Sequence, residues 1–296
     1  MSVVTNFDMG SNLTEHELGE IAALVEKRSG ILFDESRERF FSTRVKEHFL
    51  SKRLARGSDL VRVIKSSNVE YESLLERLLT QETSFFRYPD VFDAMEKKVL
   101  PELHVKKFWE NPRNLRLWCA GCSTGEEAYS IAITVAESLD FAEAWNIQLL
   151  ASDISRKALQ HAERGVYSRR ALGELQPKQI ETCFAKVGDQ FMVKPRLRNL
   201  VTFQQMNLVE TTYIGRFDAI FCMNVLIYFS EEKRREVIQR LYEALDPGGY
   251  LFLGHADYLG NAGVKLETIV HKDVRLYRKP IQSSRYSSAS SGEEQQ

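Results

Sequence analysis

Cysteine and long apolar runs are both scarce in this 296-residue sequence, and each scarcity excludes a class of protein. Four cysteines are too few for a disulfide framework in a chain of this length. The longest apolar run, AIFCMNVLIYF at 219–229, is too short to span a bilayer and contains Asn224. The first residues, MSVVTNFDMG, lack the basic and apolar parts of a signal peptide. We therefore expect a protein of the reducing cytoplasm that does not insert into a membrane.

Neither sign of charge is in excess over the whole chain, because 40 Lys and Arg residues face 41 Asp and Glu residues. This balance gives no reason to expect a nucleic-acid partner. The local balance differs, since eleven basic residues stand against five acidic ones between Lys27 and Lys65. Within that stretch Arg39, Lys46 and Arg53 recur every seven residues. They predict either a solvated helix face or a surface for an acidic protein partner.

The first third of the sequence predicts helices alone. Thr14 followed by Glu17 is a capping box, and the helix that it opens is expected to end at Gly30. The apolar spacing predicts further helices at 35–56, from Ser58 onward and at 71–79. We expect residues 12–90 to form a helical domain.

From about residue 113 the pattern changes to strands that alternate with helices, which predicts a mainly parallel sheet. Strands are predicted at 115–120, 147–151, 200–204, 217–222, 249–254, 264–270 and 274–279, the last two as an antiparallel pair. Helices are predicted at 126–139, 155–163 and 231–245, with Pro247-Gly248-Gly249 as the turn after the last. The segment 166–199 is read as an insertion with a helix at 177–184 and strand-like pieces at 190–198. The Ser-rich residues 281–296 are expected to be a disordered tail.

One stretch selects a ligand by charge: LWCAGCSTGEEAYS at 117–130, an apolar strand, a glycine-bracketed turn and a helix. In phosphate sites the same arrangement offers backbone N–H groups and a positive dipole end to an anion. Here Glu126 and Glu127 occupy the helix mouth, no Lys-Ser/Thr pair follows Gly125, and the G-x-G-x-x-G spacing is absent. The stretch favours a cationic, phosphate-free ligand such as S-adenosylmethionine (SAM), which Gly121 and Gly125 would let approach the backbone closely.

Two further segments carry polar side chains that could reach such a ligand. Asp153 follows the apolar run IQLLAS at the carboxyl end of the second strand. It could bind ribose hydroxyls there or simply cap the helix that follows. QETSFFRYP at 81–89 places Arg87 beside two phenylalanines. That guanidinium could hold a carboxylate, unless the segment is an ordinary linker with a packed Phe pair.

The run FCMNVLIYF at 221–229 is predicted to reach the sheet edge where ligands bind in such folds. Asn224 could donate to a ligand there and Tyr228 could present its hydroxyl, although the run could equally be core. Cys119 and Cys122 favour packing over a metal site, because zinc needs four ligands and no second close pair of cysteines exists. We therefore expect no metal. Nothing in the sequence decides whether His255 is a base or a turn residue.

Together these segments resemble the chemotaxis protein methyltransferases (CheR), which use SAM to methylate glutamates of chemoreceptors. The matching pieces occur in the family's order over about residues 14–279: QETSFFR, CAGCSTGEEAYSIA, ASDIS, FQQMNL, FDAIFCMNVLIYF and LDPGGYLFLGHAD. The resemblance implies an α/β fold with a Rossmann-like class I SAM-methyltransferase sheet, an N-terminal all-helical domain and a small inserted β-subdomain. It assigns receptor binding to 12–90 and SAM binding to 91–280.

The resemblance also implies roles for individual residues. Arg87 and Tyr228 would face the methyl group that is transferred, and Asp153 would bind the ribose. The residues expected to bind the cofactor are Gln81, Thr83, Arg87, Glu127, Asp153, Asn207, Leu208, Asn224 and Val225. The products would be a glutamate methyl ester and S-adenosylhomocysteine (SAH). A glutamate side chain has a pKa of about 4.3 and is ionised near pH 7, so transfer depends on positioning more than on a general base.

The partners implied by the resemblance are the cytoplasmic domains of methyl-accepting chemoreceptors, bound through the basic second helix and the β-subdomain. The loop around Gly188 is shorter than the family's usual loop, so binding is not expected to depend on a receptor C-terminal pentapeptide. Gln81 stands where the family usually has Asn, and Met223 where an Arg is common. The sequence leaves two other functions open: a SAM enzyme acting on a small acid or RNA, and a receptor-binding module without activity.

Overall fold

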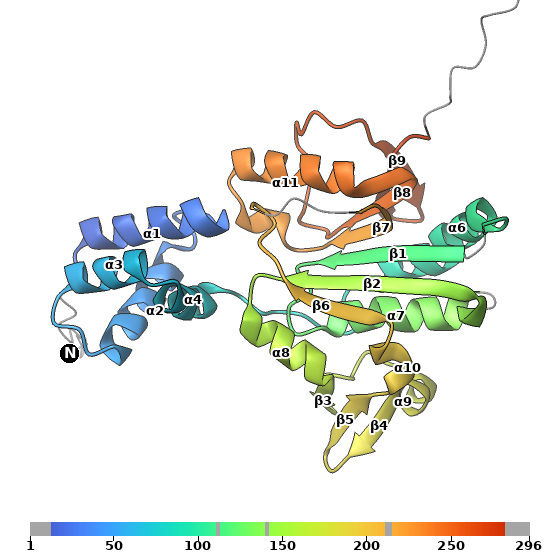
Figure 1. Cartoon of the computed structure of the whole chain (residues 1–296), viewed down its shortest axis with the longest axis horizontal. Coiled ribbons are helices and arrows are strands. Elements are labelled where there is room, and N and C mark those ends of the chain that lie inside the picture. The colour runs from blue at the N-terminus through green and yellow to red at the C-terminus, as the bar shows by residue number, and fades with distance from the viewer. Residues whose placement is uncertain (1–12, 111–112, 140–141, 211–214, 282–296) are drawn as a thin grey trace, which may run out of the picture.

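The computed structural model describes residues 13–110, 113–139, 142–210 and 215–281, so the predicted tail lies outside them except for Ile281. Four N-terminal helices lie together beside a large sheet, and a smaller sheet projects from another side of the molecule (Figure 1). Within the described ranges, no helix has the length and apolarity needed to cross a membrane.

The N-terminal helices are α1 (Glu15–Ser29), α2 (Glu38–Ser51), α3 (Gly57–Ser66) and α4 (Asn68–Leu78). The capping box at Thr14 and the stop at Gly30, whose φ is 76°, are both confirmed. The helices pack around a cluster of buried side chains that includes Ile21, Val25, Phe41, Val45, Phe49, Leu60, Ile64, Leu74 and Leu78.

Two of these helices differ from the predicted ranges. Helix α2 ends at Ser51, five residues before the predicted end at 56, because Arg53 takes a left-handed φ of 52° that stops the helix. Arg39 and Lys46 therefore share a helix, whereas Arg53 lies beyond it. Helix α4 begins at Asn68 instead of 71, since the Ser67 side chain accepts a hydrogen bond from the Glu70 N–H at 3.3 Å and caps it.

The main sheet holds all seven strands predicted outside the insertion, in the order β6-β2-β1-β7-β8-β10-β9. The strands are β1 (Arg113–Ala120), β2 (Trp145–Asp153), β6 (Val201–Gln205), β7 (Phe217–Cys222), β8 (Leu245–Leu253), β9 (Glu267–His271) and β10 (Val274–Arg278). The first five in spatial order run parallel. Strand β10 pairs antiparallel with β9, as predicted, and also with β8. Pro247-Gly248-Gly249 is not a turn before β8 but part of it, where the register with β7 shifts.

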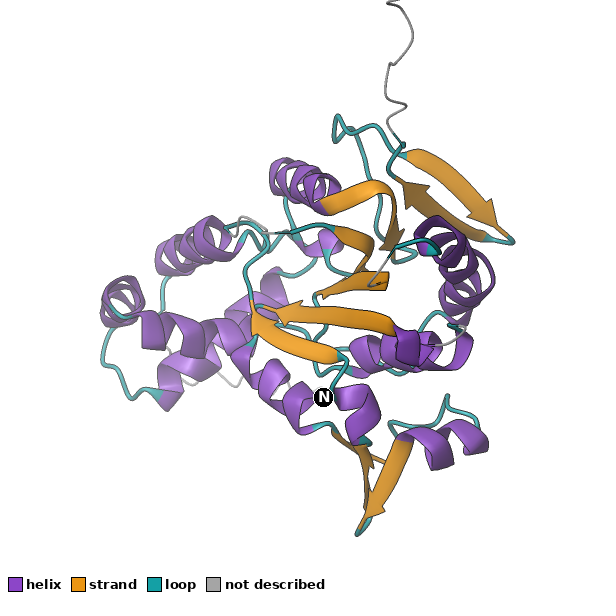
Figure 2. Cartoon of the chain, turned by 45° about the vertical axis from the view of Figure 1, so that its right-hand side comes forward, coloured by secondary structure: helices purple, strands orange, loops and turns teal. Residues whose placement is uncertain are grey.

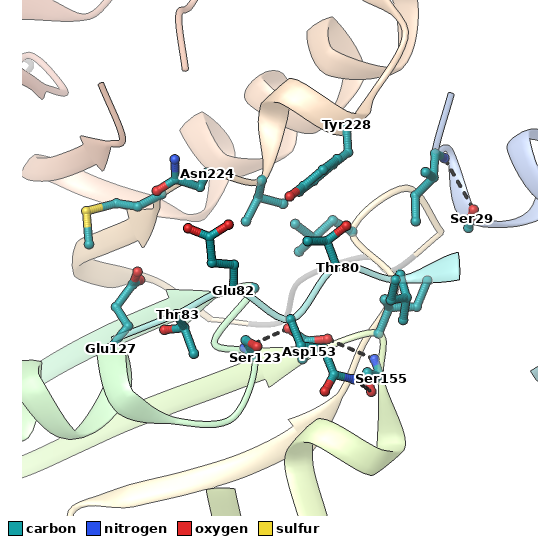
Figure 3. A pocket seen from close by; sticks show the side chains of 18 of the residues that line it. Ser29, Thr80, Glu82, Thr83, Ser123, Glu127, Asp153, Ser155, Asn224 and Tyr228 are labelled. Atoms are coloured by element: carbon teal, nitrogen blue, oxygen red, sulfur yellow. Dashed lines mark hydrogen bonds between the residues drawn. The ribbon is translucent and has the colours of Figure 1, made fainter. Parts of the chain in front are cut away.

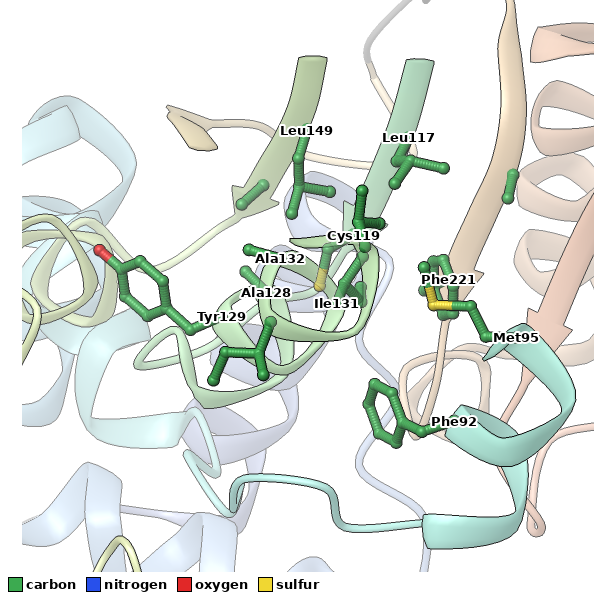
Figure 4. Close-up of a cluster of buried hydrophobic side chains, with 14 of the residues drawn as sticks. Phe92, Met95, Leu117, Cys119, Ala128, Tyr129, Ile131, Ala132, Leu149 and Phe221 are labelled. Carbon is green, nitrogen blue, oxygen red and sulfur yellow. The ribbon is translucent and has the colours of Figure 1, made fainter. Parts of the chain in front are cut away.

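Helices cover both faces of this sheet, and the small sheet stands apart from them (Figure 2). The predicted helices are α7 (Glu126–Ser138), α8 (Arg156–Arg164) and α11 (Glu231–Ala244), and a short 3-10 helix, η2 (Ala142–Ala144), precedes β2. Leu117 and Cys119 of β1 point into the cluster under α7, whereas Trp118 and Ala120 point into the cluster under α11. Figure 4 shows the first cluster, with Leu117, Phe221 and Ile131 meeting between strands and helix.

The inserted segment forms a three-stranded antiparallel sheet of β3 (Val166–Ser168), β5 (Gln190–Val193) and β4 (Phe184–Val187), with α9 (Pro177–Cys183) beside it. Gly188 and Asp189 form the turn of the β4–β5 hairpin. Of the strand-like pieces predicted at 190–198, the first corresponds to β5, whereas the second is wrong because residues 195–198 form the short helix α10 (Pro195–Arg198). Pro195 occupies the first turn of that helix, where a missing N–H is tolerated.

A further helical stretch was not predicted: α5 (Pro89–Ala94), the π-helical turn η1 (Met95–Val99) and α6 (Leu100–Lys107). The sequence pattern does not indicate this stretch, because Pro89 and Pro101 both suggest helix breaks. Each proline lies in the first turn of its helix. Proline costs little there, and the π-helical turn carries the chain from one helix into the next.

A buried ion pair fastens α6 to the sheet. The Lys107 ammonium lies 3.0 Å from the Asp218 carboxylate of β7, and the side chains are 8% and 1% exposed. Asp218 also accepts a hydrogen bond from the Arg116 N–H of β1 at 2.9 Å. Burial raises the pKa of Asp218, and the Lys107 charge and the Arg116 N–H oppose that rise. Lys107 also lies 3.5 Å from the Glu110 carboxylate, so it is removal of Lys107 that would leave a buried charge, that of Asp218, without a counter-charge.

We predict that Lys107→Met lowers the free energy of unfolding by about 3 kcal/mol at pH 7, because the Asp218 carboxylate loses its buried counter-charge. The measurement is urea unfolding followed by circular dichroism. Lys106→Met is the matched control, since Lys106 is exposed on the same helix. Equal destabilisation by the two variants would contradict the prediction.

Candidate functional site

A cavity lies at the carboxyl ends of β1, β2, β6 and β7, between the sheet and the N-terminal helices. It holds about 910 Å³ of empty space, part of it open to solvent. All ten side chains expected from the sequence line this one cavity: Gln81, Thr83, Arg87, Glu127, Asp153, Asn207, Leu208, Asn224, Val225 and Tyr228. Figure 3 shows Asn224 and Tyr228 on one side, Glu127 and Thr83 on another, and Asp153 with Ser155 on a third.

The turn after β1 forms part of the wall and requires glycine. Gly121 and Gly125 have φ values of 88° and 96°, in the left-handed region that favours glycine. A Cβ on Gly121 would lie 2.3 Å from Val225, and one on Gly125 would lie 2.7 Å from Ala162 of α8. The sequence interpretation gave both glycines a close approach to the ligand. Only Gly121 lines the cavity, and Gly125 instead lets α7 pack closely against α8.

Glu127, in the first turn of α7, is the most electrostatically unusual group in the wall. Its Oε1 accepts a hydrogen bond from the Cys119 thiol at 3.2 Å. Burial raises the pKa of Glu127 to about 8, the nearby Asp257 carboxylate adds to that rise, and Arg87 opposes it. A buried carboxylate without a cation beside it is costly here, so the group holds its proton near neutral pH in the empty cavity.

Glu126 does not share this role, although the sequence placed both glutamates at the helix mouth. It is buried away from the cavity, and its carboxylate accepts a hydrogen bond from Thr124 at 2.7 Å. Burial raises its pKa as well. Only one of the two acidic residues can therefore meet a ligand in the cavity.

Asp153 joins the two loops at this sheet edge. Its Oδ2 accepts from the Ser123 N–H and its Oδ1 from the Ser155 N–H, each at 2.8 Å. Burial raises the pKa of Asp153, and these two hydrogen bonds oppose the rise. The cap of α8 is Ser155, whose Oγ accepts from the Ala158 N–H at 3.0 Å, so the capping alternative for Asp153 is wrong. A carboxylate has about four acceptor positions, which leaves Asp153 able to accept hydrogen bonds from a ligand.

The segment 79–87 is part of the cavity wall and not an ordinary linker. Gln81 donates to Ser155 Oγ at 3.1 Å. The Arg87 guanidinium donates to the Glu82 carbonyl at 2.9 Å and to the Glu82 carboxylate at 3.3 Å. The Glu82 side chain is 78% exposed, so this second contact is readily exchanged for another carboxylate. Phe85, in contrast, is buried against Tyr167 and Phe184, as a packed aromatic would be.

The loop after β7 presents Asn224 and Tyr228, the latter on the short 3-10 helix η3 (Leu226–Tyr228). Asn224 has a φ of 59° and accepts a hydrogen bond from the Tyr88 hydroxyl at 2.8 Å. Its N–H donates to the Asp257 carboxylate, which also accepts from the Ile227 N–H at 3.2 Å. The interpretation of this loop as simple core is therefore wrong for Asn224 and Tyr228.

Residues just after α1 hold Tyr228 from the other side. The Leu32 N–H donates to the Tyr228 carbonyl at 2.9 Å, and Ile31 forms an antiparallel β-bridge with Phe229. The Arg37 guanidinium lies 4.8 Å from the centroid of the Tyr228 ring, a cation–π distance. The N-terminal helical region therefore fixes both the backbone and the ring of Tyr228.

Asn207 and Leu208 follow β6 and close the far end of the cavity. The Asn207 amide donates to the Arg28 carbonyl at 2.7 Å, and its oxygen accepts from the Val209 N–H at 3.2 Å. This amide therefore ties the loop after β6 to the end of α1. The Leu208 side chain is buried and adds an apolar surface.

The remaining candidates have structural roles. Cys119 and Cys122 are buried with raised thiol pKa values caused by burial, and no metal-binding group of His, Cys, Asp or Glu occurs in the described ranges. His255 is exposed and does not line the cavity, and its Nε2 lies 3.3 Å from Asp90. A role for it as a base at this cavity is therefore not supported.

Tyr88 and Asp257, which were not predicted as site residues, hold Asn224 in place. Asp257 follows the end of β8 closely, much as Asp153 stands at the end of β2. An acidic residue near the carboxyl end of a strand was therefore a sequence signal that could have identified Asp257, as it identified Asp153.

Comparison with known proteins places this site in a family. Residues 81–274 match the family described as "CheR methyltransferase, SAM binding domain". The chemotaxis protein methyltransferase of Vibrio parahaemolyticus is 34% identical over 87% of this chain and 94% of that protein. Chemotaxis protein methyltransferase 1 of Pseudomonas aeruginosa is 34% identical over 80% of this chain and 88% of that protein.

Among solved structures, magnesium protoporphyrin IX methyltransferase from Synechocystis PCC 6803 with bound SAM aligns with 80% of this chain and 94% of that chain. Its identity is 18% and its TM-score 0.33, too distant to bear on the function. The family match and the relatives confirm the resemblance seen in the sequence. The chain therefore belongs to the CheR methyltransferase family and is a SAM-dependent methyltransferase.

Proposed function

We propose that this protein transfers the methyl group of SAM to glutamate γ-carboxylates on the cytoplasmic domains of methyl-accepting chemoreceptors. The products are glutamate methyl esters and SAH, which makes the protein a protein-glutamate O-methyltransferase of the cytoplasm. The names of its relatives support this substrate. The observation that carries the proposal is that Glu127, Asp153, Arg87 and Tyr228 line one cavity at the carboxyl edge of the sheet.

The charges of the cavity fit SAM, which carries a sulfonium and an ammonium group but no phosphate. Among the described lining residues, the carboxyl groups of Glu82, Glu127 and Asp153 outnumber the one guanidinium, that of Arg87. The raised pKa of Glu127 marks a carboxyl group that lacks a cationic partner. We assign Asp153 to the ribose hydroxyls and Gln81 and Thr83 to the amino-acid end. The remaining parts of SAM would be held by Glu127, Asn207, Leu208, Asn224 and Val225.

Bound SAM supplies an electrophilic methyl group on its sulfonium sulfur, and the protein's task is to position the acceptor. A glutamate carboxylate is already ionised near pH 7, so no general base is required. Arg87 would orient this carboxylate by exchanging its contact with Glu82 for a bidentate contact with the acceptor. Tyr228, held by the Leu32 N–H and the Arg37 guanidinium, would align the acceptor for in-line transfer.

We assign receptor docking to the N-terminal helices and the β-subdomain. Arg39 and Lys46 are exposed on α2 and suit an acidic partner. The β4–β5 hairpin turns through Gly188 and Asp189 alone, which supports docking that does not require a receptor C-terminal pentapeptide. We expect neither nucleic-acid binding nor membrane insertion.

We predict that SAM binds more tightly as the pH rises from 6 to about 8. Ionisation of Glu127 provides the negative charge that a cation prefers, and its pKa in the empty cavity is about 8. Isothermal titration calorimetry should therefore show a proton released on binding near pH 7. Glu127→Gln should bind about 10-fold more weakly at pH 8 and should lose this part of the pH dependence. A Gln variant with the wild-type pH profile would refute the role of Glu127.

We predict that Arg87→Ala lowers methyl transfer to receptor cytoplasmic fragments by about 100-fold, because the acceptor carboxylate loses its bidentate partner. Tyr228→Phe should lower it less, since the ring and its contact with Arg37 remain. The measurement is transfer from labelled SAM, with modified glutamates mapped by mass spectrometry. Arg235→Ala on the exposed side of α11 is the control. Wild-type transfer by Arg87→Ala would exclude the orienting role.

A further inference from the structure

Glu76, near the end of α4, reaches across from the N-terminal helices to the start of α8. Its carboxylate accepts a hydrogen bond from the Ser155 hydroxyl at 2.7 Å and another from the Lys157 N–H at 3.1 Å. Leu74, Leu75 and Leu78 on the same helix are buried in the core of the N-terminal helices. The backbone of Glu76 is therefore held by that core, and its carboxylate is held by the loop that follows β2.

The side chain that Glu76 contacts, Ser155, is the junction of three segments. Ser155 is 1% exposed, and its Oγ donates to Glu76 while accepting from the Gln81 amide at 3.1 Å and from the Ala158 N–H at 3.0 Å. A buried hydroxyl with all its hydrogen bonds made has little freedom to rotate. The loop at 153–157 is therefore held by α4, by the cavity-lining segment and by α8 together.

This junction leads directly to Asp153. The Ser155 N–H donates to Asp153 Oδ1 at 2.8 Å, so the position of Ser155 sets the position of that carboxylate. Asp153 and Ser155 line the cofactor cavity, whereas Glu76 lines a separate, neighbouring cavity with Tyr71 and Glu210. Glu76 does not line the cofactor cavity, and hydrogen bonds through Ser155 connect it to Asp153 and to Gln81, which do.

The negative charge of Glu76 has two effects here: it is attracted to the N-terminus of α8, and it raises the pKa of the nearby Asp153 carboxyl by repulsion. The carboxylates of Glu76 and Asp153 both accept backbone N–H groups at the beginning of α8, one from a distant helix and one from the preceding strand. Negative groups are favoured at the N-terminus of a helix, and hydrogen bonds to ionised acceptors are stronger than those to neutral ones. A neutral side chain at position 76 would hold the loop less firmly.

We propose that Glu76 is a positioning residue for the cofactor site. It holds residues 153–157 in the conformation in which Asp153 binds the ribose, and it thereby makes cofactor affinity depend on the N-terminal helices. The inference rests on the ribose role assigned to Asp153 under the proposed function.

The first test compares Glu76→Ala and Glu76→Gln with Glu72→Ala, a change to an exposed glutamate one turn earlier in α4. Calorimetry with SAH should show about a 10-fold weaker affinity for Glu76→Ala and a smaller loss for Glu76→Gln, whose amide oxygen can still accept one of the two hydrogen bonds. Glu72→Ala should bind SAH like the wild type. The KM for SAM should rise by the same factors, with kcat at saturating SAM unchanged.

The second test is a double-mutant cycle with Asp153→Asn, which separates positioning from a general loss of stability. If Glu76 acts through Asp153, Glu76→Ala should cost less than 2-fold in SAH affinity once Asp153 is already Asn. An undiminished loss in that background overturns the proposal, as does wild-type binding and KM in both Glu76 variants while Asp153→Asn binds weakly. Wild-type SAH affinity in Asp153→Asn would instead overturn the ribose role, and this inference with it.

Discussion

The two hydrogen bonds from backbone N–H groups to the Asp153 carboxylate are the constraint on which the site depends. One comes from the turn after β1 and the other from the loop after β2, so a single side chain joins the loops at two neighbouring strand ends. The turn after β1 also carries Gly121, whose missing Cβ leaves room for Val225 from the loop after β7. The ends of β1, β2 and β7 therefore lie close together, and the cavity forms where they meet.

Around this frame the protein places carboxyl groups at some energetic cost. Burial raises the pKa of Glu127 and of Asp153, which means that the empty cavity disfavours their charged forms. A cationic cofactor relieves that cost, whereas a phosphate would increase it. The burial that disfavours the charged carboxylates of the empty cavity therefore also favours a cationic ligand. Strongly perturbed pKa values of this kind are common at functional sites.

Much of this arrangement could be predicted from local sequence signals. Apolar runs ending in Asp153 or Asn224 identify strands and their carboxyl edge, and the capping box at Thr14 identifies a helix start. The orientation of Glu126 could not be predicted, because the sequence does not show whether its carboxylate points to the Thr124 hydroxyl or into the cavity. Pro89 and Pro101 likewise concealed α5 and α6, since only the three-dimensional path shows that both lie in a first turn. Contacts such as that between Glu76 and Ser155 join residues far apart in sequence and leave no local pattern.

The β-bridge between Ile31 and Phe229 has a consequence for how such proteins can diversify. Because the stretch after α1 pairs with the loop that carries Tyr228, the N-terminal helices and the carboxyl edge of the sheet are not interchangeable modules. A chimera that exchanged the helices between relatives would also exchange the backbone partner of Tyr228. The proposed docking helices and Tyr228 would therefore be inherited as one unit, and a change in either must preserve this short stretch of pairing.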